Sequence, residues 1–200
     1  EPGVDPGHDR TQPGRRVELH RCIGERLAQG YGDPADEIAT QLAMHFERGQ
    51  DASRAVFYLQ RAGETAVRRH ASIEAAAHFE RALDLIRSMP PNRSRDTLEG
   101  SLRLALSAPL IAIHGFGSTR VEACATAART LCDSLGDLHG RFAAQRVIWN
   151  HSLMRHTVPT ALCHARELMA EAESSQEPAK LALAHRALGC SLICAGKLDD

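Results

Sequence analysis

The sequence is poor in aromatic residues and free of long apolar runs, and each shortage excludes a class of protein. Phe, Trp and Tyr make up 4% of the 200 residues, although 43% of the residues are hydrophobic. This alanine-rich composition favours close helix–helix packing over a β-sandwich, whose strands need aromatic and β-branched residues. No apolar run approaches the roughly 18 residues that a transmembrane helix needs, and no signal peptide is recognisable.

Lysine is also scarce, since Lys180 and Lys197 are the only lysines among 24 basic residues. Neither lysine stands in the G-x-x-x-x-G-K-[ST] pattern that holds nucleotide phosphates. The formal net charge is -1, so no overall basic field favours nucleic acid. We therefore expect a non-enzymatic segment with no cofactor, no metal, no direct nucleic-acid contact and no membrane contact.

The six cysteines form no C-x-x-C pair, and the chain is neither short nor rich in loops. This pattern favours reduced thiols and a cytoplasmic location over a disulfide framework. His151 and His156, followed by Cys163 and His164, leave one alternative open, a helical hydrolase that depends on a metal or a thiol.

Hydrophobic residues recur at helical spacing from Arg15 onward, and no stretch alternates as a half-buried strand would. Glycine and proline divide the chain into about nine helices, with Asp33 and Pro34 opening the second one. Thr119 and Glu122 are predicted to form a capping box. After two N-terminal helices that end near Gly30 and Gly49, the expected helices cover 51–70, 72–89, 96–113, 118–136, 138–155, 158–174 and 177–195.

The most specific pattern lies between residues 55 and 90 and combines small and aromatic residues at fixed offsets. Its members are Leu59, Ala62, Gly63, Ala66, Ala75, Phe79 and Ala82. This pattern resembles the tetratricopeptide repeat (TPR), a pair of antiparallel helices. In that resemblance Gly63 and Ala75 lie where the two helices cross, and Ala82 admits the next repeat.

A second match, which would be cut before its second helix, lies at the C-terminal end. It consists of His185, Leu188, Gly189, Leu192 and Gly196. Two weaker units place Pro109 and Trp149 at the glycine position. Positions 63, 109, 149 and 189 are spaced by 46, 40 and 40 residues, longer than the roughly 34 of a TPR unit. We therefore predict an all-α solenoid of stretched, TPR-like helix pairs, and an irregular helical bundle is the alternative.

Several stretches resemble the region that follows the ATPase module of large bacterial signal-transduction ATPases, which carry adenylate or guanylate cyclase domains or LuxR-type DNA-binding domains. These stretches are 15–20, 23–27, 42–49, 55–63, 115–117 and 131–137. The resemblance implies a fragment in which 1–13 is a loop or disordered lead-in, 14–50 a helical linker or cap after a missing ATPase module, and 51–200 the repeat array. ATP would then bind in the missing upstream domain.

Such arrays bind a protein, a peptide or a small inducer in a groove lined by the first helix of each pair, and they pass that state to adjoining domains of the same chain. Counting from the glycine positions, the expected groove residues are Gln60, Glu64, Arg103, Arg146, Asn150 and Arg186. Arginines at these positions suit a carboxylate or an extended acidic peptide. A purely structural array that mediates oligomerisation is a further alternative.

Overall fold

The computed structural model describes residues 13–31 and 37–196, which fold into helices joined by short turns. Nine helices and no strand lie within these residues, which confirms the all-α prediction. None of the described helices is both long and apolar enough to cross a bilayer. The helices are α1 (Pro13–Tyr31), α2 (Ala39–Arg48), α3 (Ala52–Arg68), α4 (Ser72–Arg87), α5 (Arg93–His114), α6 (Thr119–Leu135), α7 (Leu138–Met154), α8 (Val158–Ser175) and α9 (Pro178–Cys194).

The predicted lead-in over 1–13 falls outside the described residues except for Pro13, which begins α1. The predicted N-cap Asp33 and the following Pro34 also fall outside them. The chain forms two compact units, residues 1–62 and 63–200, which are described separately.

In the first unit, α1 and α2 approach closely at Gly24. A Cβ atom there would lie 3.1 Å from the ring of Phe46, which is 1% exposed. The guanidinium of Arg54 lies 4.4 Å from the centre of the same ring and binds Glu25 at 2.9 Å. The close approach of α1 to α2 therefore depends on glycine at position 24, which leaves room for the Phe46 ring.

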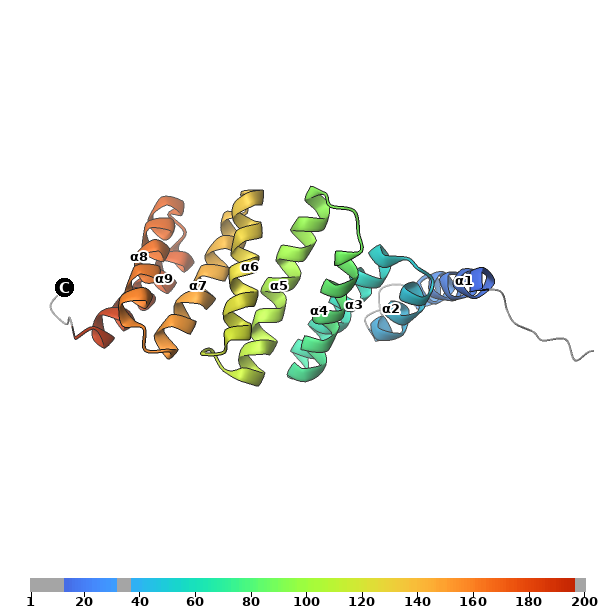
Figure 1. Cartoon of the computed structure of the whole chain (residues 1–200), viewed down its shortest axis with the longest axis horizontal. Helices are drawn as coiled ribbons and strands as arrows, with labels where there is room; N and C mark the ends of the chain where they lie inside the picture. Colours follow the sequence, from blue (N-terminus) through green and yellow to red (C-terminus); the bar gives the residue numbers. More distant parts are fainter. Residues whose placement is uncertain (1–12, 32–36, 197–200) are drawn as a thin grey trace, which may run out of the picture. The chain divides into compact units, whose positions relative to one another are not determined.

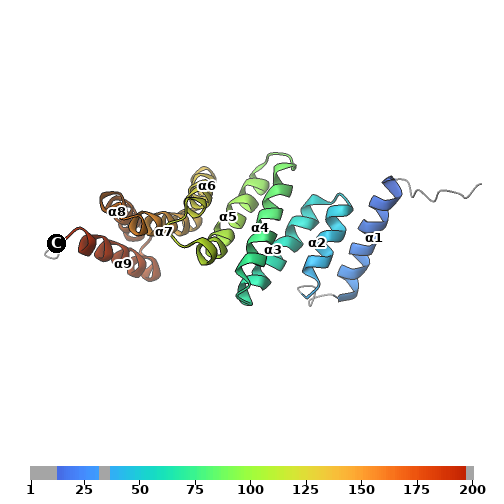
Figure 2. The ribbon, with the colours of Figure 1, turned by 60° about the horizontal axis from the view of Figure 1, so that its bottom comes forward.

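In the second unit, each helix from α4 to α9 packs against the next one along the chain (Figure 1, Figure 2). Even-numbered helices are also linked to one another, since Arg120 of α6 binds Glu80 of α4 at 2.6 Å. Among the odd-numbered helices, α5 contacts α7, and Trp149 of α7 donates a hydrogen bond to Ser191 of α9 at 2.9 Å. The unit thus contains an even-numbered and an odd-numbered set of neighbouring helices.

The helix ends of the second unit recur at a regular interval. Left-handed backbone conformations occur at Gly136, His156, Gln176 and Gly196, each 20 residues after the last, with φ of 73°, 57°, 54° and 69°. Such residues end helices because their N–H groups bond back to the last carbonyls. Residues 131–140 and 171–180 also share one sequence of buried and exposed positions. Helix ends in this part therefore recur every 20 residues, and two of them fall at the turns expected at Gly136 and Gly196.

Three helix starts differ from the sequence prediction. Helix α2, which was expected to open at Pro34, begins at Ala39 with Ile38 as its N-cap. Helix α5 begins at Arg93 rather than residue 96, because the Asn92 side chain accepts a hydrogen bond from the backbone N–H of Arg95 at 2.9 Å. The capping box predicted for Thr119 and Glu122 is wrong. Ser118 is the N-cap of α6, its hydroxyl accepts a hydrogen bond from the backbone N–H of Arg120 at 3.3 Å, and Thr119 is already helical.

Candidate functional site

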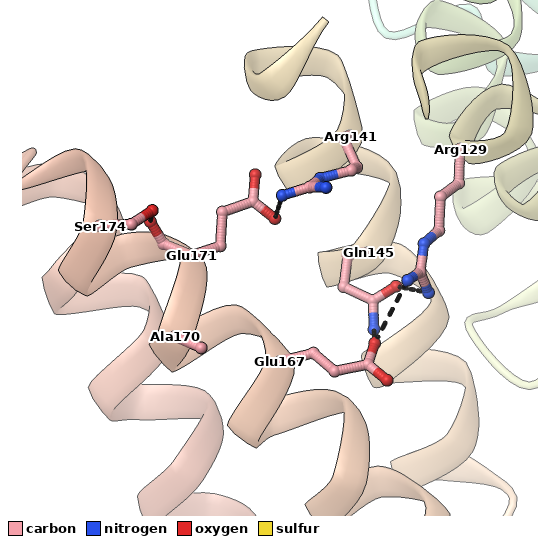
Figure 3. A pocket seen from close by; sticks show the side chains of 7 residues that line it. All are labelled: Arg129, Arg141, Gln145, Glu167, Ala170, Glu171 and Ser174. Atoms are coloured by element: carbon pink, nitrogen blue, oxygen red, sulfur yellow. Dashed lines mark hydrogen bonds and ion pairs between the residues drawn. The ribbon is translucent and has the colours of Figure 1, made fainter. Parts of the chain in front are cut away.

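Helices α6, α7 and α8 enclose a hollow of about 360 Å³, called here the polar hollow (Figure 3). Polar and charged residues make up six of its seven lining residues. It consists of Arg129, Arg141, Gln145, Glu167, Ala170, Glu171 and Ser174.

Gln145 lies at the base of the polar hollow and is 2% exposed. Its amide Nε2 donates to Glu167 at 2.6 Å and lies 2.9 Å from His164 Nδ1, while its Oε1 accepts from Arg129. Gln145 lies on α7, and the start of that helix is fixed by Asp137, which accepts a hydrogen bond from the backbone N–H of Gly140 at 3.0 Å. All the hydrogen-bonding atoms of a buried amide are thus engaged, as burial requires.

The arginines of the polar hollow are paired with carboxylates. Arg129 lies 3.4 Å from Glu167, and Arg141 lies 3.2 Å from Glu171. Asp133 lies 3.8 Å from Arg141 and 3.9 Å from Arg129. These ion pairs link α6, α7 and α8 to one another. An anionic ligand would have to compete with the carboxylates for the arginines.

Two buried atoms of this network lack a hydrogen-bond partner within the described part of the chain. They are Nε of Arg141 and Oε1 of Glu171, a side chain that is 10% exposed. Both atoms are sealed from solvent, so a ligand would reach them only after the side chains move.

A second hollow of about 420 Å³ lies among α4, α5 and α6 and contains Arg103, one of the expected groove residues. Arg103 binds Glu99 of its own helix at 2.7 Å. The Cys124 thiol donates to the Arg103 carbonyl at 3.2 Å. Arg103 therefore faces the even-numbered helices and does not join the other predicted arginines.

The remaining arginines lie on α7 and α9, two helices that contain no aspartate or glutamate. Arg146 is half-buried, and the exposed Arg186 holds its guanidinium 5.8 Å from the centre of the Trp149 ring. Neither guanidinium forms an ion pair with a carboxylate in the described stretches 13–31 and 37–196. Asn150 donates to the Arg146 carbonyl at 3.2 Å. Arg146, Asn150 and Arg186 are called here the basic face.

Gln60 and Glu64 both lie on α3, but Gln60 belongs to the first unit and Glu64 to the second. Both are half-buried, and each has an interaction within the chain. Of the six expected groove residues, only Arg146, Asn150 and Arg186 therefore lie on two helices that the Trp149–Ser191 hydrogen bond joins.

The residues expected to pack the repeats occupy two different environments. At Gly63 an added Cβ atom would lie 2.6 Å from the Phe79 ring, and Ala75 and Ala82 are both 0% exposed. Leu59 is 5% exposed. At Gly189, by contrast, an added Cβ atom would meet no described atom within 4 Å, and the neighbouring Leu188 is half-buried.

The metal ligands that the hydrolase alternative would need do not lie together in the described part of the chain. No group of three or more His, Cys, Asp and Glu residues able to hold a metal lies within the described residues. The buried His151 faces Glu122 at 3.7 Å, whereas His156 is exposed in a turn. Burial and the neighbouring Asp137 raise the pKa of the Cys132 thiol to about 11, and burial raises the pKa of Cys124 as well. These two thiols are poor nucleophiles because the thiolate is the reactive form.

The polar hollow was not predicted from the sequence. Gln145 was one visible signal, because it and Arg146 are the only polar residues in the run from Phe142 to Trp149. The other signal was the spacing of Glu167 and Glu171, which are one helical turn apart and face the same side.

No protein-family model matches the chain, and no curated protein matches it in sequence.

Proposed function

We propose that residues 51–196 form a TPR-like solenoid that binds a partner and carries out no chemistry of its own. The recurrence of helix ends every 20 residues between 136 and 196, and the burial pattern shared by 131–140 and 171–180, support this architecture. The contacts within the even-numbered and within the odd-numbered helices also fit stacked helix pairs.

The ligand that fits best is an acidic, extended peptide segment of a partner protein, bound on the basic face. One observation carries this proposal: α7 and α9 lack any acidic residue, and their Arg146 and Arg186 lie 40 residues apart without a carboxylate partner among the described residues. Guanidinium groups bind carboxylates through paired, charge-assisted hydrogen bonds. The polar hollow suits this ligand less well, because its own carboxylates already pair with its arginines.

The resemblance of several stretches to bacterial signal-transduction ATPases supports a wider role. In that role the chain is a cytoplasmic sensor or scaffold segment that reports its bound partner to an ATPase module and to a cyclase or DNA-binding output domain. An upstream P-loop domain in the coding sequence is the observation expected from this role.

The binding proposal is tested with fluorescein-labelled hexaglutamate and the full chain. Binding is measured by fluorescence anisotropy, and the single tryptophan, Trp149, provides a second signal because Arg186 lies over its ring. We expect saturable binding that weakens when the salt concentration rises from about 0.05 to 0.3 M, because ions screen exposed charges. The double variant Arg146→Gln, Arg186→Gln is expected to bind about tenfold more weakly, equivalent to about 1.4 kcal/mol.

The matched control is Arg129→Gln, which removes one positive charge from the polar hollow and leaves the basic face intact. This variant should bind hexaglutamate nearly as well as the unchanged chain does. Equal binding by the unchanged chain and the double variant, or an equal loss in the control, would contradict the proposal.

A further inference from the structure

The two ion pairs of the polar hollow differ in how completely their hydrogen-bonding groups are used (Figure 3). Between Arg129 and Glu167, the buried amide of Gln145 engages both side chains, since its Oε1 accepts from Arg129 and its Nε2 donates to Glu167 at 2.6 Å. Between Arg141 and Glu171 there is one contact, from Nη2 to Oε2 at 3.2 Å. The Arg141–Glu171 pair is therefore the incompletely bonded half of the hollow.

Two atoms of the Arg141–Glu171 pair are buried without a hydrogen-bond partner in the described part of the chain. They are a donor, Nε of Arg141, and an acceptor, Oε1 of Glu171. The remaining guanidinium nitrogen, Nη1, faces the exposed Asp133 at 3.8 Å. The Glu171 side chain is only 10% exposed, so water compensates little for the missing bond. A ligand that brings both a donor and an acceptor to this pair would satisfy both atoms.

The charges of the polar hollow restrict the kind of ligand that it can hold. Its lining contains two arginines, Arg129 and Arg141, and two glutamates, Glu167 and Glu171. An anion that drew Arg141 away would leave the Glu171 carboxylate buried and unpaired, and a cation that drew Glu171 away would leave Arg141 unpaired. A zwitterion pairs with both side chains at once. The volume of about 360 Å³ suits a small ligand, since it lies near the lower end of small-molecule pockets.

We propose that the polar hollow binds a small zwitterion of the free α-amino acid class. The ammonium group donates to Glu171 Oε1, and the carboxylate accepts from Arg141 Nε. An α-amino acid carries these two groups on one carbon, which matches a donor and an acceptor that belong to one ion pair. Because both protein atoms are sealed from solvent, the Arg141 and Glu171 side chains separate as the ligand enters and pair again when it leaves. The inference goes beyond the proposed function and does not depend on the acidic peptide.

The first test compares ligands on the unchanged full chain. The thermal midpoint is measured with each of the common free L-amino acids, because a ligand of the folded state raises it. Isothermal titration calorimetry then gives the Kd of the amino acid that raises the midpoint most. The matched controls are its decarboxylated amine and its deaminated acid, each of which keeps one of the two charged groups. We expect both to bind at least about tenfold more weakly, because each loses a charge-assisted hydrogen bond.

The second test changes the chain. The double variant Arg141→Gln, Glu171→Gln removes both charges together and leaves no buried charge unpaired, so it is expected to fold. It should bind the amino acid at least about tenfold more weakly. The matched control is Arg120→Gln, Glu80→Gln, which removes another ion pair that joins two helices, and it should leave the Kd unchanged. The ligand comparison decides the question without this variant if the variant proves unstable.

Three results would overturn the inference. They are no binding of any amino acid to the unchanged chain, binding of the amine or the acid as tight as that of the amino acid, and an unchanged Kd in the folded double variant Arg141→Gln, Glu171→Gln. Failure of this inference is distinguishable from failure of the proposed function. Arg146→Gln, Arg186→Gln should lose hexaglutamate binding and keep amino-acid binding, because these residues do not line the polar hollow.

Discussion

Gly63 shows at the scale of one residue how a missing side chain sets the distance between two helices. An added Cβ atom would lie 2.6 Å from the Phe79 ring, and that ring is 1% exposed and has little room to move. We therefore predict that Gly63→Ala lowers the free energy of unfolding by about 1–3 kcal/mol, because overpacking forces side chains and backbone to shift. Urea-induced unfolding followed by circular dichroism measures this change.

Gly189→Ala is the control for that experiment, because the same substitution meets open space there. It should leave stability unchanged or raise it by up to about 1 kcal/mol, the difference in helix propensity between alanine and glycine. A Gly63→Ala chain as stable as the Gly189→Ala chain would disprove the steric account.

At the scale of the helix, the ends at Gly136, His156, Gln176 and Gly196 use the same left-handed conformation with different residues. His156 and Gln176 adopt φ of 57° and 54°, where only glycine is free of steric cost. We predict that His156→Gly or Gln176→Gly raises the free energy of unfolding by up to about 1 kcal/mol. Gly136→Ala should lower it by a similar amount. Thermal unfolding of the three variants measures these changes. A lower stability in His156→Gly or Gln176→Gly, or a higher stability in Gly136→Ala, would contradict the prediction.

The sequence indicated most of these elements, because glycine, proline and apolar spacing act within one or two helical turns. The start of α5 was predicted three residues late, since Asn92 was not recognised as its cap. The site was harder to predict. Gln145 contacts residues 16 to 22 positions away in sequence, on α6 and on α8, and only the packing of three helices brings them together. Offsets from the glycine positions placed Arg103, Arg146 and Arg186 in one expected groove, but they could not show that Arg103 faces another set of helices.

At the scale of the whole molecule, the two units should respond differently to acid. His45 of the first unit is 8% exposed, and its Nδ1 lies 3.1 Å from Nδ1 of His20. Burial, followed by repulsion from His20 and Arg48, lowers the pKa of His45 below its ordinary value of 6.5. Because the unfolded chain then binds a proton more readily than the folded chain does, the contribution of His45 is complete above pH 6.5 and is lost as the pH falls below it.

We therefore predict faster hydrogen exchange in α1 and α2 at about pH 5.5 than at about pH 7.5, after correction for the intrinsic rate. The fluorescence of Trp149, which lies in the second unit, should change little over the same range. His45→Gln should reduce the acid sensitivity of α1 and α2. Two results would count against this account: unchanged protection of α1 and α2 from hydrogen exchange in acid, or an equal loss of protection in α6–α9.

The absence of acidic residues from α7 and α9 bears on how fast an acidic partner would associate. Their neighbour α8 carries Glu167, Glu171 and Glu173, so positive and negative charges are separated between adjacent helices. A separation of this kind gives the molecule a local electric field even though its net charge is only -1. Such a field guides an acidic partner during diffusion and turns it toward one side before contact. The association rate constant, more than the dissociation rate constant, should therefore fall as salt is added.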